Sequence, residues 1–290
     1  VYKRQAIAGD IAGSRFEWSL WEGTSLAEAA CVGYESDAPT ADSRGSTAHT
    51  FDLFHAESHP TDDSVLMVAV MDWVLEGGDP RASLRRRFRK APRPELFGKF
   101  FRAWAESDSN TPCGSIGNGA AMRIAPVAYA ARTAEEVLAM AHENALATHA
   151  TVDGIAGAQA VALGVFLARS GTNPADILRE ISRQFGYDLD KPLDAWRPGY
   201  RFTSACPETV PIAFRAFLET NSHEAAIRAA ISLGGDTDTI ACMAGALAGA
   251  FRGITPSTAQ SVGEKLDVTM MATILEFERR YPEAVRFQTV

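Results

Sequence analysis

Nearly every readable segment of this chain has helical rather than strand character, and alternating β-branched stretches are almost absent. Segment 62–77 begins with acidic residues and ends in Gly77 and Gly78, the expected signals at the two ends of a helix. Segment 133–148 opens with Thr133 three residues before Glu136, which is a capping-box pattern. We therefore expect an all-α fold. Further helices are expected at 95–107, 150–171, 173–186, 209–221, 222–235 and 268–282.

Two segments, 33–61 and 187–208, lack helical periodicity and are rich in polar residues or proline. Both contain aromatic residues, which a flexible linker between separate cores would not need. We interpret them as long ordered loops and expect one domain over residues 1–290. Pairs of Gly and Ala recur in AIAGDIAGS, GIAGAQA and AGALAGA, which predicts close approach of helices.

The composition limits the class of partner and the compartment. The net charge of -8 argues against nucleic acid as the main partner, and we interpret the basic run at 85–90 as a solvated helix face. The four cysteines have no zinc-type spacing, which is typical of reduced thiols in a cytosolic protein. No apolar stretch reaches transmembrane length without interruption. We therefore expect a cytoplasmic protein without a membrane partner, with a monomer as the default. Residues 1–5 lack an initiator Met and are given no functional role.

Two acidic motifs each stand directly before an apolar helical run, namely HPTDDSVLMVAV at 59–70 and SLGGDTDTIACMAGALAGAFRG at 232–253. Either motif alone is typical of helix capping, because Ser, Thr and Asp accept backbone N–H bonds there. Capping needs one such residue per helix, however, and adjacent carboxylates repel one another unless cations separate them. Hard divalent cations prefer carboxylate and hydroxyl oxygens, so the pair of motifs favours a metal site.

Three weaker motifs accompany them. AGDIAGSRFEW, with Asp10 and Glu17, is by itself typical of a glycine-containing turn followed by a surface Glu. CGSIGNGAAMRIAPVA at 113–128 can expose several backbone N–H groups before a helix, as a phosphate-binding loop does, but it lacks the Lys-Ser/Thr of a P-loop. THATVDG places His149 at a helix start, where a single His usually caps or packs.

The order of GDIAGSRFE, PTDDS, GNGAAMRIAPVA, THATVDGIAGAQA and SLGGDTDTIACMAGALAGA resembles that of the ADP-ribosylglycohydrolase family, from Ala6 to Gly253. This family includes the enzyme that removes ADP-ribose from nitrogenase reductase, and RPGYRF with CPETVP is similar to a bacterial subgroup. The resemblance implies an all-α, single-domain orthogonal helical fold with two Mg²⁺ ions in a central cleft, with Mn²⁺ as a substitute.

The resemblance also implies roles for individual residues. Glu17 matches the family's glutamate near the metals, which can act as a mobile gate, and His149 matches a histidine on the adenosine side of the cleft. The implied contacts to the diphosphate and distal ribose are Gly114, Ser115, Gly117, Asn118 and Gly119. The implied metal ligands are Thr61, Asp62, Asp63, Asp236, Asp238 and Thr239.

The implied reaction is hydrolysis of the N- or O-glycosidic bond at the anomeric carbon of ADP-ribose, on modified protein side chains or related small conjugates. Magnesium would reverse the field of a carboxylate cluster that otherwise repels the diphosphate. The expected catalytic residues are Glu17, near the scissile bond, and Asp62, Asp63 or Asp238 as the base for water.

Two alternatives remain open. A two-metal phosphoesterase acting on a nucleotide would release AMP rather than ADP-ribose. A non-catalytic relative would bind ADP-ribose without turnover. The linkage is also open among arginine, serine, O-acetyl-ADP-ribose and nucleic-acid-linked ADP-ribose.

Overall fold

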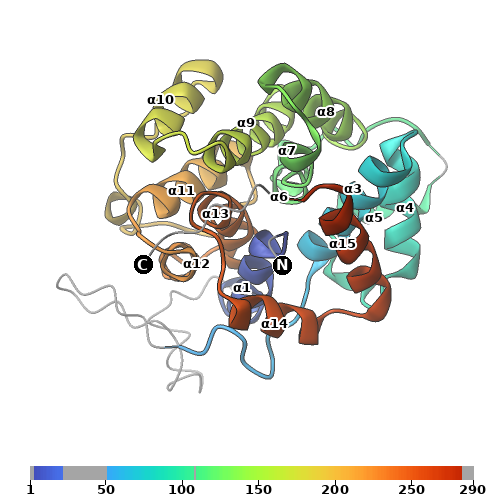
Figure 1. Ribbon diagram of the computed structural model, residues 1–290, viewed down its shortest axis with the longest axis horizontal. Helices are drawn as coiled ribbons and strands as arrows, with labels where there is room; N and C mark the ends of the chain where they lie inside the picture. The colour runs from blue at the N-terminus through green and yellow to red at the C-terminus, as the bar shows by residue number, and fades with distance from the viewer. Residues whose placement is uncertain (1–2, 22–50, 108, 283–290) are drawn as a thin grey trace.

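The computed structural model describes residues 3–21, 51–107 and 109–282 (Figure 1). Within these ranges the chain is helical and forms no β-strand, and the one β-type pairing is an isolated bridge between Gly117 and Ala205. The predicted all-α fold is therefore confirmed. The predicted loop at 33–61 lies outside the described residues up to position 50, and residues 187–208 form an ordered connection that contains one short 3₁₀ turn.

The described helices occur in the following order along the chain. The α-helices are α1 (Gln5–Trp21), α3 (Asp62–Glu76), α4 (Pro80–Lys90), α5 (Lys99–Glu106), α6 (Gly119–Arg123), α7 (Val127–Ala130), α8 (Ala134–Leu146), α9 (Val152–Arg169), α10 (Pro174–Phe185), α11 (Cys206–Leu218), α12 (His223–Ile231), α13 (Thr237–Arg252), α14 (Pro256–Lys265) and α15 (Val268–Arg280). The 3₁₀ helices are η2 (Pro94–Leu96) and η3 (Leu193–Ala195).

Helix α13 forms the centre of the fold. Its small apolar residues are buried from Thr237 to Gly249, as expected for a helix that is apolar nearly all round. Figure 1 shows α1, α9, α11 and α12 around it, with α4, α5 and α15 at one side of the molecule. The chain enters α13 through Gly234 and Gly235, whose φ values of 81° and 77° lie in the left-handed region that favours glycine. The glycine pair therefore makes the sharp turn that directs this helix into the core.

Helix α1 approaches α13 closely because glycines face it. A Cβ atom on Gly9 would lie 2.0 Å from the Ala241 carbonyl oxygen, and one on Gly13 would lie 2.5 Å from Asp238 Cα. The predicted close approach of helices at Gly/Ala pairs is thus confirmed here. The interpretation of AGDIAGSRFEW as a turn with a surface Glu is wrong, because this motif lies inside α1, where Gly residues allow backbone contact.

The basic run at 85–90 is less solvated than we expected. It lies in α4, whose Leu84 and Phe88 are buried in a second apolar cluster. The Arg87 Nε atom lies 2.6 Å from Asp72 Oδ2, and the Arg85 guanidinium lies 4.3 Å from the Trp104 ring centroid. These arginines therefore stabilise the packing of α3, α4 and α5 as well as facing water.

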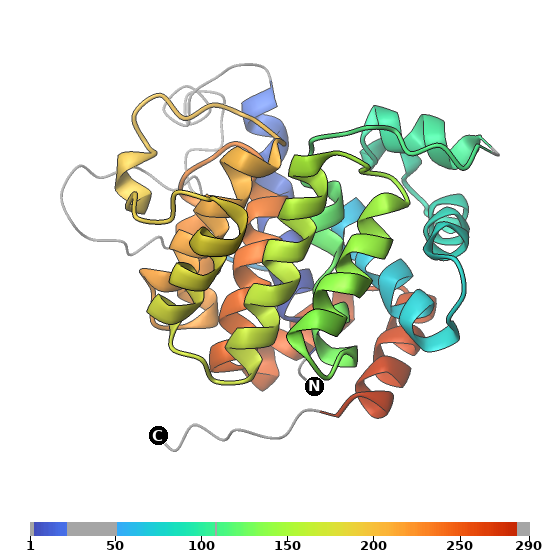
Figure 2. The same ribbon diagram turned by 90° about the horizontal axis from the view of Figure 1, so that it is seen from above.

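The prediction that no apolar stretch reaches transmembrane length is wrong for helix α9. Residues Val152–Arg169 are long and apolar enough to cross a membrane by length and composition alone, although 56% of this window is buried inside the fold. Such burial is typical of a core helix. In Figure 2, α9 runs alongside α13 in the helical stack, in agreement with its packing against α8, α10 and α13.

Most predicted helices are present, with local differences at their ends. The helix expected at 222–235 ends at Ile231, because residues 232–235 form the turn that enters α13. The one expected at 209–221 begins earlier, at Cys206, since Pro207 is tolerated in the first turn of a helix. The one expected at 95–107 is divided into η2 and α5. The sequence predicts no helix at α1, α7 or α14, and it indicates α4 and α6 only as a helix face at 85–90 and a helix after the glycine-rich loop.

Candidate metal centre

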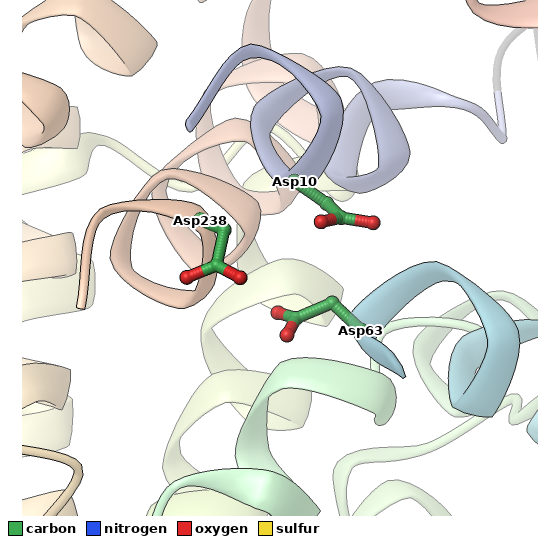
Figure 3. A group of neighbouring side chains, drawn as sticks. All are labelled: Asp10, Asp63 and Asp238. Atoms are coloured by element: carbon green, nitrogen blue, oxygen red, sulfur yellow. The ribbon is translucent and has the colours of Figure 1, made fainter. Parts of the chain in front are cut away.

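Three buried carboxylates from three helices converge on one point. Asp10 from α1, Asp63 from α3 and Asp238 from α13 each offer a carboxylate oxygen, and these oxygens all lie within 4.8 Å of one another. Figure 3 shows the three carboxyl groups turned toward a common space between the helices. The N-terminal ends of α3 and α13 both lie here, and the positive end of each helix dipole favours negative charge.

A second carboxylate group shares Asp238 with the first. Glu17, Asp236 and Asp238 also have one oxygen each within 4.8 Å of one another. Asp236 and Asp238 are buried, whereas Glu17 is partly exposed. The structure thus brings the two acidic motifs of the sequence together, and Asp238 belongs to both groups of three carboxylates. Asp62 belongs to neither group of three, but burial, followed by the charges of Asp238 and Asp10, raises its pKa.

At the start of α3, the N-cap residue is Thr61. The Thr61 hydroxyl accepts a hydrogen bond from Asp63 N over 3.2 Å and donates one to Asp10 Oδ1 over 2.7 Å. The Asp62 carboxylate accepts hydrogen bonds from its own backbone N–H and from that of Gly98. The capping interpretation is therefore correct for Thr61, whereas Asp63 keeps one carboxylate oxygen without a hydrogen bond among the described residues.

At the start of α13, the cap position is occupied by a carboxylate that does not cap. Asp236 makes no side-chain capping bond, and its Oδ2 accepts instead from Asn118 Nδ2 over 2.7 Å. The Thr239 hydroxyl donates to Asp63 Oδ2 over 3.1 Å, which links α13 to α3. Asp63 Oδ1 is buried and has no hydrogen-bond partner among the described residues. This bare buried oxygen needs a cation or a proton.

Asp10 is a member of the carboxylate cluster that the predicted site residues did not include. Its Oδ2 accepts from the backbone N–H of Thr61 over 3.0 Å and of Ser64 over 3.1 Å, and also from the Ser64 hydroxyl. With Thr61 Oγ1 on its other oxygen, Asp10 is largely saturated by the start of α3. A signal was present in the sequence: Asp10, Ser14 and Glu17 are spaced as i, i+4 and i+7, which places them on one helix face.

Burial and mutual repulsion disfavour ionisation of the whole cluster. Desolvation, followed by the charge of Asp238, raises the pKa of Asp10 to about 7 and that of Glu17 to about 10. Desolvation and the charge of Asp236 raise the pKa of Asp238 to about 8. Desolvation also raises the pKa values of Asp62, Asp63 and Asp236. Without added positive charge, several of these groups would hold protons near neutral pH, so the donor set fits divalent cations.

The predicted glycine-rich loop lies beside this cluster, and part of its N–H capacity is already used. Gly117 N donates to Ser115 Oγ over 2.9 Å, and Asn118 N donates to the Ser204 carbonyl over 2.7 Å. The prediction of exposed N–H groups is therefore wrong for Gly117 and Asn118, whose N–H groups already have partners within the protein. Ser115 is also held by Thr151, whose hydroxyl donates to the Ser115 carbonyl over 2.7 Å.

His149 completes the same side of the site. Its ring lies against Gly119, where an added Cβ would be 3.3 Å from Nε2 and 3.2 Å from Cε1. The predicted substrate-contact residues of the loop and His149 are therefore neighbours. Through the bond from Asn118 to Asp236, they are also joined to the carboxylate cluster.

The 187–208 segment borders both the loop and the glycine turn. Arg197 donates to the Ser232 carbonyl over 2.8 Å and to the Ser232 hydroxyl over 2.9 Å. The Tyr200 ring packs over Gly235, where an added Cβ would lie 2.7 Å from Tyr200 Cε1. This segment therefore fixes the turn from which α13 begins.

Comparison with known proteins gives a consistent result. The sequence model of the family described as ADP-ribosylglycohydrolase matches residues 6–277. ADP-ribosylhydrolase ARH3 of Bos taurus is 32% identical over 212 residues, which cover 58% of this chain and 57% of that protein. The same protein of Homo sapiens is 31% identical over 212 residues, with 58% of each chain covered. The matched region thus spans less than two thirds of these relatives.

A solved structure shares the fold. It is titled "ADP-ribosylglycohydrolase-related protein complex" and superposes with a TM-score of 0.63 over 96% of this chain and 99% of that chain. The sequence identity between the two is 21%, so this comparison bears on the fold alone.

Proposed function

Because this chain belongs to the ADP-ribosylglycohydrolase family, we propose that it is a hydrolase that cleaves the glycosidic bond at the anomeric carbon of ADP-ribose. The substrate would be an ADP-ribosylated protein side chain or a related small conjugate. The observation that carries the proposal is the sharing of Asp238 by two carboxylate groups drawn from α1, α3 and α13. A cluster of this kind suits a site built for two divalent cations.

In this proposal, Asp10 positions the start of α3, and the other residues of the cluster bind the cations. Asp10 accepts hydrogen bonds on both oxygens, so we assign it the role of holding Thr61 and Ser64 in place. Bound Mg²⁺ ions would neutralise the cluster and polarise ribose or water oxygens at the anomeric centre. The residues that would hold them are Asp62, Asp63, Asp236 and Asp238, with the hydroxyls of Thr61 and Thr239 and the nearby Glu17.

Exposure narrows the choice of proton-transfer groups. Asp63, Asp236 and Asp238 are each at most 4% exposed, whereas Glu17 and Asp62 are partly exposed. A general acid or base must come within hydrogen-bond reach of the reacting oxygen, directly or through one water. We therefore favour Asp62 as the base for water among the three predicted candidates. Glu17, whose pKa is raised by burial and neighbouring carboxylates, is the group best suited to hold a proton near the leaving group.

Substrate positioning would come from the glycine-rich loop. The loop from Gly114 to Gly119 and the ring of His149 lie together, next to the carboxylate cluster. In this arrangement the loop and His149 would hold the diphosphate and adenosine. The scissile bond would then lie beside Asp62 and Glu17.

The test is product analysis with separate arginine-linked and serine-linked ADP-ribosylated substrates, with Mg²⁺ and with a chelator. We expect free ADP-ribose in the presence of Mg²⁺, and a loss of at least about 100-fold in kcat for Asp62→Asn and Asp238→Asn. Release of AMP would instead identify a phosphoesterase. Binding of ADP-ribose without turnover on either substrate would identify a non-catalytic relative.

A further inference from the structure

A buried chain of hydrogen bonds ends at the ring of His149. Arg123 is fully buried, and its Nη2 donates to Thr148 Oγ1 over 2.9 Å. The same hydroxyl oxygen lies 2.7 Å from His149 Nδ1. Arg123 is held in place by Asn144, through Nε to the side-chain oxygen over 2.9 Å and through Nη2 to the carbonyl over 3.1 Å.

The chemistry of these groups fixes the direction of each bond. A guanidinium has donors only, so the Thr148 hydroxyl accepts from Arg123. Thr148 is fully buried, and among the described residues its hydroxyl has no acceptor other than His149 Nδ1. A buried hydroxyl hydrogen without an acceptor would lose its hydrogen bond to water with no replacement. The hydroxyl therefore donates to Nδ1, and Nδ1 carries no proton.

We infer that Arg123 and Thr148 are positioning residues that lock His149 as the neutral Nε2–H tautomer, so that Nε2 presents a hydrogen-bond donor beside the glycine-rich loop. The ligand atom that this donor fits is an uncharged or anionic oxygen, such as a ribose hydroxyl or a phosphate oxygen. The tautomer stands on the hydrogen-bond chain alone, whereas its use in binding ADP-ribose rests on the proposed function.

Two further observations agree with this direction. Burial, together with the charge of Arg123, lowers the pKa of His149 to about 3, so the ring is neutral at physiological pH. Nε2 makes no hydrogen bond to any described residue, and it lies at Gly119, where even a methyl group would come within 3.3 Å. The donor therefore lies beside Gly119, which has no side chain to cover it.

The tautomer can be read directly by NMR. The chain has six histidines, so we would label them with ¹⁵N and record long-range ¹H–¹⁵N spectra of the whole protein near neutral pH, with His149→Gln to identify the ring signals. We expect a protonated Nε2 and an unprotonated Nδ1 for His149. A protonated Nδ1 would overturn the inference without the need for any further variant.

Variants of Thr148 test the positioning role. Thr148→Val removes the hydroxyl but keeps the shape, and we expect it to shift the His149 ¹⁵N signals and make the Nδ1–H tautomer detectable. Thr148→Ser keeps the hydroxyl and should restore the original pattern. An unchanged pattern in Thr148→Val would overturn the role of the hydroxyl.

Binding of ADP-ribose, measured by calorimetry with Mg²⁺ present, tests the use of the donor. We expect Thr148→Val to weaken binding about 5- to 10-fold and Thr148→Ser to stay within about twofold. Equal binding by both variants would overturn the link to the ligand. If the unaltered protein does not bind ADP-ribose at all, the proposed function fails, while the NMR result still decides the tautomer.

Discussion

Asn118 Nδ2 donates to Asp236 Oδ2 over 2.7 Å, and this bond joins the glycine-rich loop to the carboxylate cluster. Asn118 is only 4% exposed, and its backbone N–H is held by Ser204. The amide therefore has a fixed orientation and in turn orients the Asp236 carboxylate. Partners of this kind contribute to metal affinity in many sites, although they never touch the ion.

We predict that Asn118→Ala weakens the binding of Mn²⁺ or Mg²⁺ by about 10-fold or more, because Asp236 loses its orienting donor. Cation affinity would be measured by calorimetry or by Mn²⁺ electron paramagnetic resonance. Asn110, which is exposed, provides the control Asn110→Ala. Equal cation affinity in Asn118→Ala and the control would refute the role.

Lys265 fastens the turn that precedes the Thr61 motif. Its Nζ donates to the carbonyls of His55 over 2.6 Å and Ser58 over 2.9 Å. We predict that Lys265→Met lowers the free energy of unfolding by about 1–3 kcal/mol, because these partly buried carbonyls lose a charged donor. We also expect weaker cation binding, since the turn sets the position of Thr61.

Chemical denaturation and Mn²⁺ titration would measure both effects. The matched control is Lys90→Met, since Lys90 is an exposed lysine on α4. A drop in stability with unchanged cation affinity would show that the turn does not position the acidic motif.

The helical class could be predicted from the sequence because its elements carry strong local signals. Segment 62–77 has acids at one end and glycines at the other, and the bounds of α3 agree with this predicted helix to within one residue. The short helices α6 and α7, of 5 and 4 residues, lack room for such a pattern and depend on tertiary contacts. Helix α1 was missed for a different reason: Gly9 and Gly13 are typical of a turn locally, and only the packing against α13 explains them.

In the site too, some features have a local sequence signal and others depend on tertiary contacts. The acidic residues of the two motifs could be assigned to one site from the sequence. Each motif has more acidic residues than a helix cap requires, and this can be seen locally. That Asp10 supports Thr61 and Ser64 depends on how α1 packs beside α3, which no local pattern gives. The roles of Asn118 and Thr148 are equally out of reach, because their partners Asp236 and Arg123 lie far away in the sequence.

Gly13 offers a test of how the two helices hold the site together. A Cβ on Gly13 would lie 2.5 Å from Asp238 Cα, and the backbone of α13 cannot move aside without shifting Asp238. We predict that Gly13→Ala destabilises the fold by about 1–3 kcal/mol and weakens cation binding. The control is Gly98→Ala, where the backbone has φ of -53° and an added Cβ meets no atom within 4 Å. If Gly13→Ala bound cations as tightly as the control, the contact would not set the site.

The last prediction concerns pH and cation removal. In the chelator-treated protein, burial and repulsion raise the pKa of Asp10 to about 7 and that of Asp238 to about 8, from an unfolded value of 3.8. The folded state therefore holds protons that the unfolded state has released. For such groups the favourable contribution is complete below the unfolded pKa and is lost as pH rises through the folded values. Metal-free stability should fall between about pH 4 and pH 8, by about 1.4 kcal/mol per pH unit for each extra proton held.

Saturating Mg²⁺ should reverse or flatten this slope, because cations bind the ionised carboxylates and stabilise only the folded state. Urea denaturation across this pH range, with chelator and with Mg²⁺, measures both curves. Asp238→Asn should reduce the slope of the metal-free curve, since it removes a titrating group and relieves the repulsion on Asp10 and Glu17. Metal-free stability that rises from pH 5 to pH 8 would contradict the description of the cluster as a set of buried, mutually repelling acids.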